Sequence, residues 1–328
     1  MNEYRLVTHA QVEDSPGFAE ALCRLNSLTF GEYYGVFFPT PDFINWYVTR
    51  PGLELGLSQA AFRGEELVSS LFVTLARMRL GGEMVLCGFV DTVMTHPSHR
   101  RRGLASSLLQ RALAAMKSAG AEVSLLYASC EDPPEPPQIM YQRLGYSVYE
   151  LALRFVKQPP HTAEAAPATL IPPDDGARIS FASALSQHDG WIELDDSLWR
   201  WRRIQRPPHY PAILCRTPGG ALCAMCSGDL LATGQPRRVT VVSDLVLPDE
   251  SREEGDLKAI IATAVSDAPI TVFCANSDTT LNRCLRSLAF VPVATEAAMV
   301  RPLTQAAADL VRTQPRDWYA AVESIIGV

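Results

Sequence analysis

The stretch VMTHPSHRRRGLASSLL at residues 93–109 joins a strand to a helix through a basic loop that contains one glycine. The strand is the apolar run that begins near residue 84. On the helix side, apolar residues recur every three or four positions from Gly103 to about Lys117, as in an amphipathic helix. A strand at 122–130, a short helix near 137–144 and a strand at 146–155 follow. The sequence therefore predicts an α/β fold with a mixed sheet (α+β mixed sheet).

The loop itself has the form R-x-x-G-x-A and suits a diphosphate. Successive main-chain N–H groups at a helix N-terminus form a nest for anions, and the helix dipole strengthens it. Gly103 and Ala105 are small, so the backbone can approach a ligand closely. The arginines at 100–102 add positive charge. The alternative is a basic turn that caps an ordinary helix, but its place directly after a strand favours the anion site.

Composition and charge indicate a globular cytoplasmic protein. The 328 residues are 47% apolar, enough for two domains with cores of their own. A net charge of −7 argues against nucleic-acid binding and favours a cationic small-molecule partner. The N-terminus is acidic and unlike a signal peptide, and because no apolar run approaches the length of a membrane span, we expect no membrane association.

The eight cysteines lie mostly in apolar, strand-like runs, as buried free thiols do in cytoplasmic proteins. Cys223 and Cys226 have CxxC spacing. No second Cys or His pair follows at matching spacing, so we expect two thiols on a buried strand and no metal.

A Pro- and Ala-rich segment at 157–176 is predicted to be a linker between a first domain at 1–156 and a second at 177–328. The second half repeats motifs of the first in the same order. FINWYVTRP (43–51) is echoed by LWRWRRIQRP (198–207), ELVSSLFV (66–73) by ALCAMCSG (221–228), FVDTVMTHPSHRRRG (89–103) by VSDLVLPDESREEG (242–255), and MYQRLGYSVY (140–149) by CLRSLAFVPV (284–293). Ordered echoes of this kind indicate a tandem duplication.

VMTHPSHRRRGLASSLL, followed by MYQRLGY, resembles motifs A and B of the GNAT (GCN5-related N-acetyltransferase) superfamily. The tandem arrangement is most similar to the enhanced-intracellular-survival aminoglycoside acetyltransferases. The resemblance covers residues 1–155 and, more weakly, 180–300. It implies two tandem GNAT-like domains, acetyl-CoA as cosubstrate, and acetyl transfer to a primary amine of a small molecule.

That branch also carries a third, sterol-carrier-like domain, which we expect this chain to lack because it ends at Val328. Aminoglycosides are therefore not carried over as the substrate. In the branch the C-terminal carboxylate enters the site; we do not expect this of Val328, since the domain that delivers it is missing.

The resemblance also implies roles for particular residues. Tyr141, in Tyr141-Gln142-Arg143-Leu144-Gly145-Tyr146, matches the family's tyrosine and would protonate the leaving thiolate as general acid; the alternative is an aromatic side chain that packs on a helix face. The implied acyl-CoA contacts are the backbone at Val93, Met94 and Thr95 for the pantetheine arm and thioester oxygen, the loop Arg100, Arg101, Arg102, Gly103, Leu104 and Ala105 for the diphosphate, and Ser129.

Asp91 is the candidate general base, because a carboxylate flanked by valines on a strand would be partly desolvated and more basic. Glu131 and Asp132, at the end of the following strand, are alternatives. Asp91 could instead cap a turn or pair with an arginine, which its echo Asp244 in the second half favours.

The second copy is predicted to be degenerate. Where the first copy has its phosphate loop, the second reads Arg252-Glu253-Glu254-Gly255-Asp256-Leu257, whose carboxylates would repel a diphosphate. Leu285 stands in the place of Tyr141, and Ala289 in that of Gly145. We therefore expect one acyl-CoA per chain, held by the first copy, with the acceptor amine bound between the copies.

Two other functions stay open at this point. One is a catalytically silent acyl-CoA-binding or sensory protein. The other is a GNAT variant that acts on a thiol or a malonyl group. Homo-oligomer formation is also open, because the sequence carries no pattern that tests it.

Overall fold

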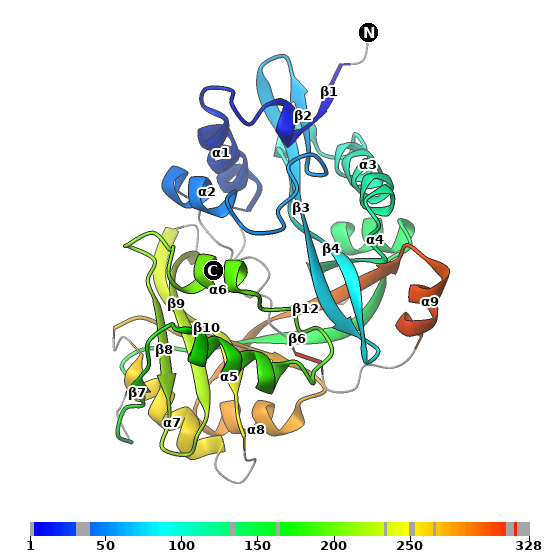
Figure 1. Ribbon diagram of the computed structural model, residues 1–328. Coiled ribbons are helices and arrows are strands. Elements are labelled where there is room, and N and C mark those ends of the chain that lie inside the picture. The colour runs from blue at the N-terminus through cyan, green and yellow to red at the C-terminus, as the bar shows by residue number, and fades with distance from the viewer. Residues whose placement is uncertain are drawn as a thin grey trace.

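A computed structural model describes residues 3–30, 40–131, 135–161, 165–232, 235–248, 253–264, 267–312 and 318–319. Its strands form one mixed sheet in the order β1-β2-β3-β4-β5-β12-β6-β11-β10-β9-β8-β7 (Figure 1). The strands are β1 (Arg5–Thr8), β2 (Gln59–Arg63), β3 (Glu66–Leu80), β4 (Glu83–Thr95), β5 (Val123–Ser129), β6 (Ser147–Lys157), β7 (Thr169–Leu170), β8 (Ala212–Arg216), β9 (Leu222–Ala232), β10 (Gln235–Val246), β11 (Ile270–Ala275) and β12 (Val291–Pro302).

Nine α-helices are assigned within the described residues: α1 (Phe18–Phe30), α2 (Pro41–Tyr47), α3 (Leu104–Ser118), α4 (Pro136–Arg143), α5 (Asp175–Leu185), α6 (Asp196–Arg203), α7 (Glu253–Thr263), α8 (Thr279–Ser287) and α9 (Gln305–Val311). The predicted strand–loop–helix unit is confirmed, with β4 followed by α3. A tight turn at Gly81-Gly82 joins β3 to β4 in one long hairpin (Figure 1). Because both glycines have positive φ, this turn takes a conformation that most residues avoid.

The two halves of the chain exchange their last strands. β6, which ends the first half, pairs with β11 of the second half, and β12, from the second half, pairs with β5 of the first. β6 and β12 also pair with each other at the middle of the sheet. The exchange makes one continuous sheet out of two repeats, consistent with a tandem arrangement. The predicted boundaries at 156 and 176 stay a prediction, and the segment between them contains β7 and the start of α5.

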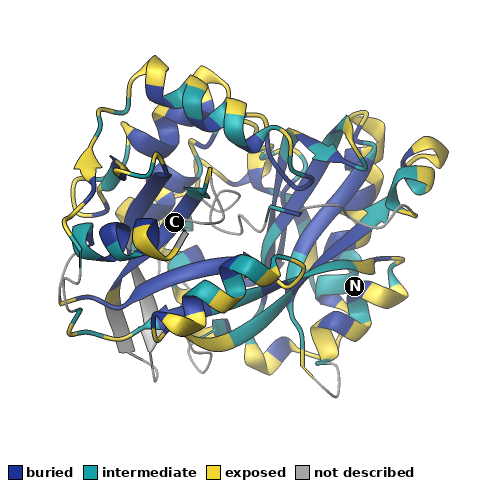
Figure 2. Cartoon of the chain, turned by 90° about the horizontal axis from the view of Figure 1, so that it is seen from below, coloured by how far each residue is buried: buried dark blue, intermediate teal, exposed yellow. Residues whose placement is uncertain are grey.

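Each face of the sheet has its own buried core. One cluster takes side chains from α1, α2, α5 and α6, and so belongs to both halves. At its centre Trp46 of α2 stacks on Trp201 of α6, with ring centroids 4.2 Å apart and planes 3° from parallel. A second cluster packs α3 and α4 onto the first half, and a third packs α7 and α8 onto the second. Figure 2 shows the result, with buried strands inside and helices exposed on their outer faces.

Candidate functional site

β4 and β5 run parallel but pair over only three residues each. Cys87–Phe89 of β4 match Val123–Leu125 of β5. β4 continues to Thr95 and β5 to Ser129, and beyond the paired stretch the ladder between them ends within the described residues. Residues 90–95 of β4 and 126–129 of β5 do not pair with each other, and we call these two stretches the β4–β5 wedge. Main-chain groups on this side of β4 are therefore available to a ligand.

A bulge in β4 bends the strand at the wedge. Phe72 of β3 lies opposite Asp91, whereas Ser70 lies opposite Met94, so Thr92 and Val93 together face the single residue between. Thr92 has a φ of 51°, which a β-branched side chain rarely adopts. A bulge of this kind locally disrupts pairing and re-aims the chain.

The loop after β4 forms the predicted nest. Arg101 has a φ of 64°, and Gly103, the N-cap of α3, has a φ of 76°. Within the described residues, the main-chain N–H groups of residues 101–106 have no hydrogen-bond acceptor. A Cβ added at Gly103 would meet nothing within 4 Å, so the space in front of the loop is open. Consecutive unpaired N–H groups at the start of a 15-residue helix make a strong site for an anion.

The three loop arginines have different partners. The Arg100 guanidinium donates to the main-chain carbonyls of Thr95 (3.3 Å) and Thr29 (3.1 Å), so it braces the loop against α1. Arg102 makes an exposed ion pair with Glu3 at 3.3 Å. Arg101 is exposed and has no hydrogen bond or ion pair to any described residue. The cation available to a ligand is therefore Arg101, a distinction that the sequence alone did not make.

The backbone at residues 93–95 lies along the wedge. The N–H of His96 bonds to the carbonyl of Val68 on β3, so by alternation the main-chain groups of Met94 also face β3, and those of Val93 and Thr95 face the wedge. The hydroxyl of Ser69 donates to the Met94 carbonyl at 2.6 Å. Ser69 is a residue that sequence analysis missed, because it lies 25 positions away on β3. Ser129 ends β5 on the other side of the wedge.

Tyr141 lies in the last turn of α4, only 6% exposed, and packs among the side chains that bury α3. Burial raises the pKa of its phenol well above the usual value. Its hydroxyl makes no hydrogen bond within the described part of the chain. The nearby phenol of Tyr146, by contrast, is bound to Ser124 at 2.7 Å. Of these two tyrosines, Tyr141 is therefore the one whose hydroxyl can donate a hydrogen bond to a ligand.

Asp91, the predicted base, is held by three side chains. Its carboxylate accepts hydrogen bonds from Tyr47 (2.7 Å), Thr92 (2.8 Å) and Arg50 (2.9 Å). Arg50 is itself buried, so Asp91 and Arg50 form a buried ion pair. These contacts engage both carboxylate oxygens. Of the alternatives, Glu131 is exposed at the end of β5, and Asp132 lies outside the described residues.

Residues 29–149 match the family described as the acetyltransferase (GNAT) domain. The chain contains a GNAT domain. The match includes the β4–β5 wedge, the nest and Tyr141, and it confirms the resemblance that the motifs indicated.

Solved structures extend the likeness over most of the chain. N-myristoyltransferase of Saccharomyces cerevisiae with bound myristoyl-CoA is 11% identical, with a TM-score of 0.70 over 92% of this chain and 79% of that chain. A GCN5-related N-acetyltransferase from Anabaena variabilis is 15% identical, with a TM-score of 0.60 over 92% and 73%. Eis1 from Mycobacterium abscessus is 17% identical, with a TM-score of 0.54 over 94% and 76%. Identities this low establish the fold. No curated protein gives a significant sequence match.

The GNAT domain and this fold together support an acyl-CoA-dependent acyltransferase. The second half shares the fold but differs at the nest. α7 starts at Glu253, which places Gly255 inside the helix, whereas Gly103 precedes α3. Asp256 is buried and accepts a hydrogen bond from the Thr217 hydroxyl, so it faces inward. The predicted loop residues at 249–252 lie outside the described residues.

The echo of α4 keeps its backbone but loses its phenol. Gly145 and Ala289 follow α4 and α8 with φ values of 84° and 61°, and each turn is closed by the same pattern of main-chain hydrogen bonds. Leu285 replaces Tyr141 and is fully buried among apolar side chains. The end of α8 thus keeps the backbone of the α4 turn but has no phenol at this position.

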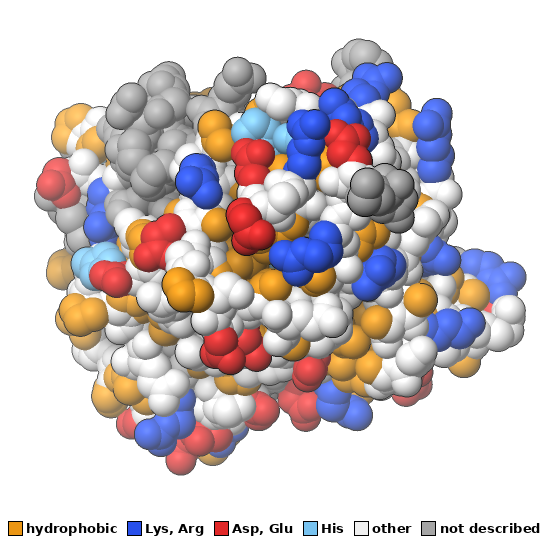
Figure 3. All heavy atoms as spheres, turned by 90° about the horizontal axis from the view of Figure 1, so that it is seen from above, with side chains coloured by type: hydrophobic (Ala, Val, Ile, Leu, Met, Phe, Trp, Pro, Cys, Tyr) orange, Lys and Arg blue, Asp and Glu red, His pale blue; other side chains and the backbone are white. Residues whose placement is uncertain are grey.

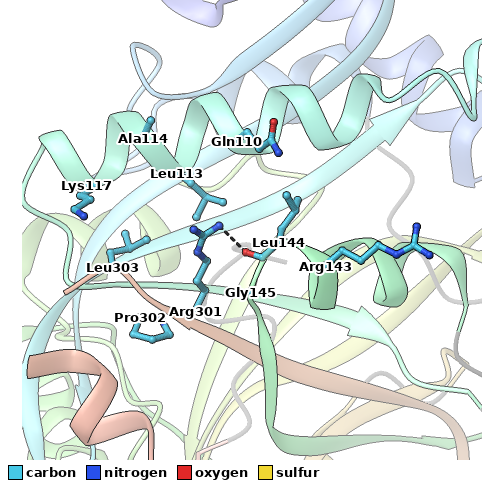
Figure 4. Close-up of a pocket in the computed structure, with 10 residues that line it drawn as sticks. All are labelled: Gln110, Leu113, Ala114, Lys117, Arg143, Leu144, Gly145, Arg301, Pro302 and Leu303. Carbon is cyan, nitrogen blue, oxygen red and sulfur yellow. Dashed lines mark hydrogen bonds between the residues drawn. The ribbon is translucent and has the colours of Figure 1, made fainter. Parts of the chain in front are cut away.

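A separate pocket of about 570 Å³ lies at the far end of α3 from the nest. Figure 4 shows its lining from α3, the end of α4 and the end of β12, with Arg301 bound to the Leu144 carbonyl. The lining of α3 begins at Gln110, roughly 9 Å along the helix from Leu104. This pocket is therefore distinct from the β4–β5 wedge and the nest.

The distribution of charge on the surface fits an anionic ligand. Seen from above, Lys and Arg side chains are concentrated on the half of the face where α3 lies in Figure 1 (Figure 3). Among the described residues, no cluster of His, Cys, Asp and Glu could hold a metal ion. Cys223 and Cys226 are buried on β9, as predicted. No described helix is long and apolar enough to cross a membrane.

Proposed function

We propose that the protein is an N-acyltransferase that transfers an acetyl group from acetyl-CoA to a primary amine of a small cationic molecule. The observation that carries this proposal is the nest of unpaired N–H groups at residues 101–106, directly after a strand that diverges from its parallel neighbour. The nest suits the diphosphate of CoA, and the wedge suits the extended pantetheine arm, whose amides need main-chain partners.

In this proposal the thioester lies against residues 93–95, whose main chain bonds the pantetheine amides and the thioester oxygen. The amine nitrogen forms a bond to the carbonyl carbon while the carbon–sulfur bond breaks. The sulfur leaves as a thiolate that takes a proton, and the nitrogen loses one. Leu104 and Ala105 contribute their N–H groups to the nest, and Ser129 meets the CoA arm from β5.

Tyr141 is the proposed acid. A phenol is protonated at neutral pH, and burial raises the pKa of Tyr141 further, so Tyr141 would stabilise the developing thiolate as a hydrogen-bond donor. Asp91 as the base stays a prediction that its three hydrogen bonds argue against. The amine proton is then lost to water. A small fraction of an amine with a pKa near 10 is already deprotonated at neutral pH, and this fraction can react.

The net charge of −7 supports a cationic acceptor. The proposal also places the protein in the cytoplasm, with residues 1–156 as the catalytic domain, 157–176 as the linker and 177–328 as a degenerate copy that helps to wall the acceptor cleft. The C-terminal residues, Val328 included, lie outside the described residues, so the role of the C-terminal carboxylate stays a prediction.

The test is release of free thiol from acetyl-CoA in the presence of a panel of amines, with myristoyl-CoA and malonyl-CoA as parallel donors. We expect turnover with acetyl-CoA and at least one small cationic amine, and none with the Gly103→Glu variant. Turnover with myristoyl-CoA but not with acetyl-CoA would indicate a long-chain acyltransferase. Tight CoA binding without turnover with any amine would replace the enzyme by a silent acyl-CoA-binding protein. Transfer to a thiol leaves the number of free thiols unchanged, so acetylation of an added thiol, detected by mass spectrometry, would favour the variant activity.

A further inference from the structure

The backbone of β4 is strained at the point where it leaves β5. Thr92, with its φ of 51°, is one of only three described non-glycine residues with positive φ. Such a conformation costs free energy and persists only where the surroundings hold it. The residue before it is Asp91, and the residues after it are those that line the wedge.

Asp91 ties this strained residue to α2 and to the loop that follows it. One carboxylate oxygen accepts from the hydroxyls of Thr92 and Tyr47, and the other accepts from the Arg50 guanidinium. Arg50 also donates to the Tyr47 hydroxyl at 3.1 Å and to Thr74 on β3. Its guanidinium lies over the Tyr47 ring, 4.4 Å from the centroid. We call Asp91, Tyr47 and Arg50 the clamp.

The second half also has a buried aspartate beside a bulge, although here the bulge residue precedes the aspartate and does not have a positive φ. The register of β10 against β9 shifts between Val242 and Asp244, which leaves Ser243 as the extra residue of a bulge. Asp244 is buried and accepts from Arg202 at 2.9 Å, from Arg203, and from the Tyr319 hydroxyl at 3.1 Å. This half has Leu285 in place of Tyr141, so its Asp244 has no catalytic tyrosine to work with. We infer that this carboxylate stabilises the backbone beside the bulge.

We propose that the clamp positions the catalytic backbone: Asp91, held by Tyr47 and Arg50, fixes the bulge at Thr92 and so aims the main chain of residues 93–95 at the acyl-CoA. The inference rests on the proposed function, since it assigns Asp91 a positioning role in that reaction. A base must have a free oxygen for the amine proton, whereas the Asp91 carboxylate already accepts three hydrogen bonds beside a buried guanidinium.

The first experiment compares Asp91→Asn with Asp244→Asn by hydrogen exchange, without any substrate. Loss of the clamp should raise the exchange rate of the Met94 and His96 amides, which face β3, at least tenfold in Asp91→Asn, while Asp244→Asn leaves them unchanged. Unchanged exchange at Met94 and His96 in a folded Asp91→Asn protein would overturn the proposal. If Asp91→Asn does not fold, Arg50→Lys, which keeps the charge and loses the planar fork, takes its place.

The second experiment uses turnover and separates positioning from base catalysis. For positioning, Asp91→Asn lowers kcat about tenfold at every pH, and the shape of the pH profile does not change. In a Thr92→Gly background, where glycine adopts the positive φ without strain, the same substitution should lower kcat less than threefold. If Asp91 is instead the general base, Asp91→Asn should remove the acidic limb of the pH profile and lower kcat 10²-fold or more. Thr92→Gly should then not restore kcat.

The two experiments also keep the proposals apart. If wild-type protein turns over no amine, the proposed function fails, but the exchange experiment still reports on the clamp. If turnover is present and exchange at Met94 and His96 is insensitive to Asp91→Asn, the clamp fails and the proposed function stands. Asp244→Asn is the matched control in the exchange experiment, because it removes a buried carboxylate beside a bulge in the other half of the chain.

Discussion

Replacing Gly103 by alanine tests the phosphate loop at the residue that starts α3. Gly103 has a φ of 76°, where an L-residue costs about 1–2 kcal/mol. Alanine also restricts the unfolded chain, which returns about 0.4–1 kcal/mol. Because nothing lies within 4 Å of the added Cβ, no steric term is added. The expected net loss of unfolding free energy is therefore about 1 kcal/mol.

The matched control is Gly255→Ala, at the position that the sequence aligned with Gly103. Gly255 lies inside α7, where alanine is preferred over glycine by about 0.5–1 kcal/mol. The two substitutions should therefore change the unfolding free energy in opposite directions. Urea unfolding of each variant, with a common slope, measures both.

The binding arm of the same experiment uses calorimetry with CoA. The alanine methyl group would occupy the open space where the diphosphate approaches the N–H groups, so we expect binding at least tenfold weaker, a loss of about 1.4 kcal/mol. Gly255→Ala should bind CoA like wild type, with one CoA per chain. Gly103→Glu should abolish binding, and Gly255→Glu should keep it. Wild-type affinity in Gly103→Ala would refute the phosphate loop.

Three further predictions concern the acid, the free cation and a buried base. Tyr141→Phe should lower kcat 10- to 100-fold with CoA affinity unchanged, while Tyr146→Phe keeps kcat within twofold; weaker CoA binding in Tyr141→Phe would make it a packing residue. Arg101→Ala should weaken CoA binding about tenfold without changing urea stability, an effect that shrinks as salt rises; loss of stability instead would show a structural role. Burial lowers the pKa of His9 to about 4, so the unfolded chain binds its proton near pH 6.5, before the folded chain does. The unfolding free energy should therefore fall by up to about 3 kcal/mol as pH falls from 6.5 to 4, and His9→Phe should flatten that window; an unchanged slope would contradict it.

Local pattern predicted the elements that carry the site. Helical periodicity after Gly103 and the strand before it are properties of neighbouring residues, and α3 and β4 follow them closely. The basic loop between them was identifiable for the same reason, because a nest needs only consecutive N–H groups and a small residue. The echo between Gly145 and Ala289 was also local, and it reappears as two positive-φ helix ends.

The sequence could not predict which side chains meet at the site. Asp91 looked like a base on its strand, but Tyr47 and Arg50, 44 and 41 positions away, turn it into the centre of a buried cluster. The three loop arginines were equivalent in sequence, and only the folded chain gives Arg100 the carbonyl of Thr29 to bind. Contacts of this kind depend on the packing of α1 and α2 against the sheet.

By itself, then, the sequence determined the strand–loop–helix unit around residues 93–109, the nest and the repeat of motifs, since each arises from the conformations of adjacent residues. The tertiary structure alone decided that β6 and β12 cross between the halves, because both are apolar strands that local pattern would pair equally well with their own repeat. It also decided that β4 diverges from β5 after Phe89. Just beyond it lie the positive φ of Thr92 and the carboxylate of Asp91, which Tyr47 and Arg50 reach only in the folded chain.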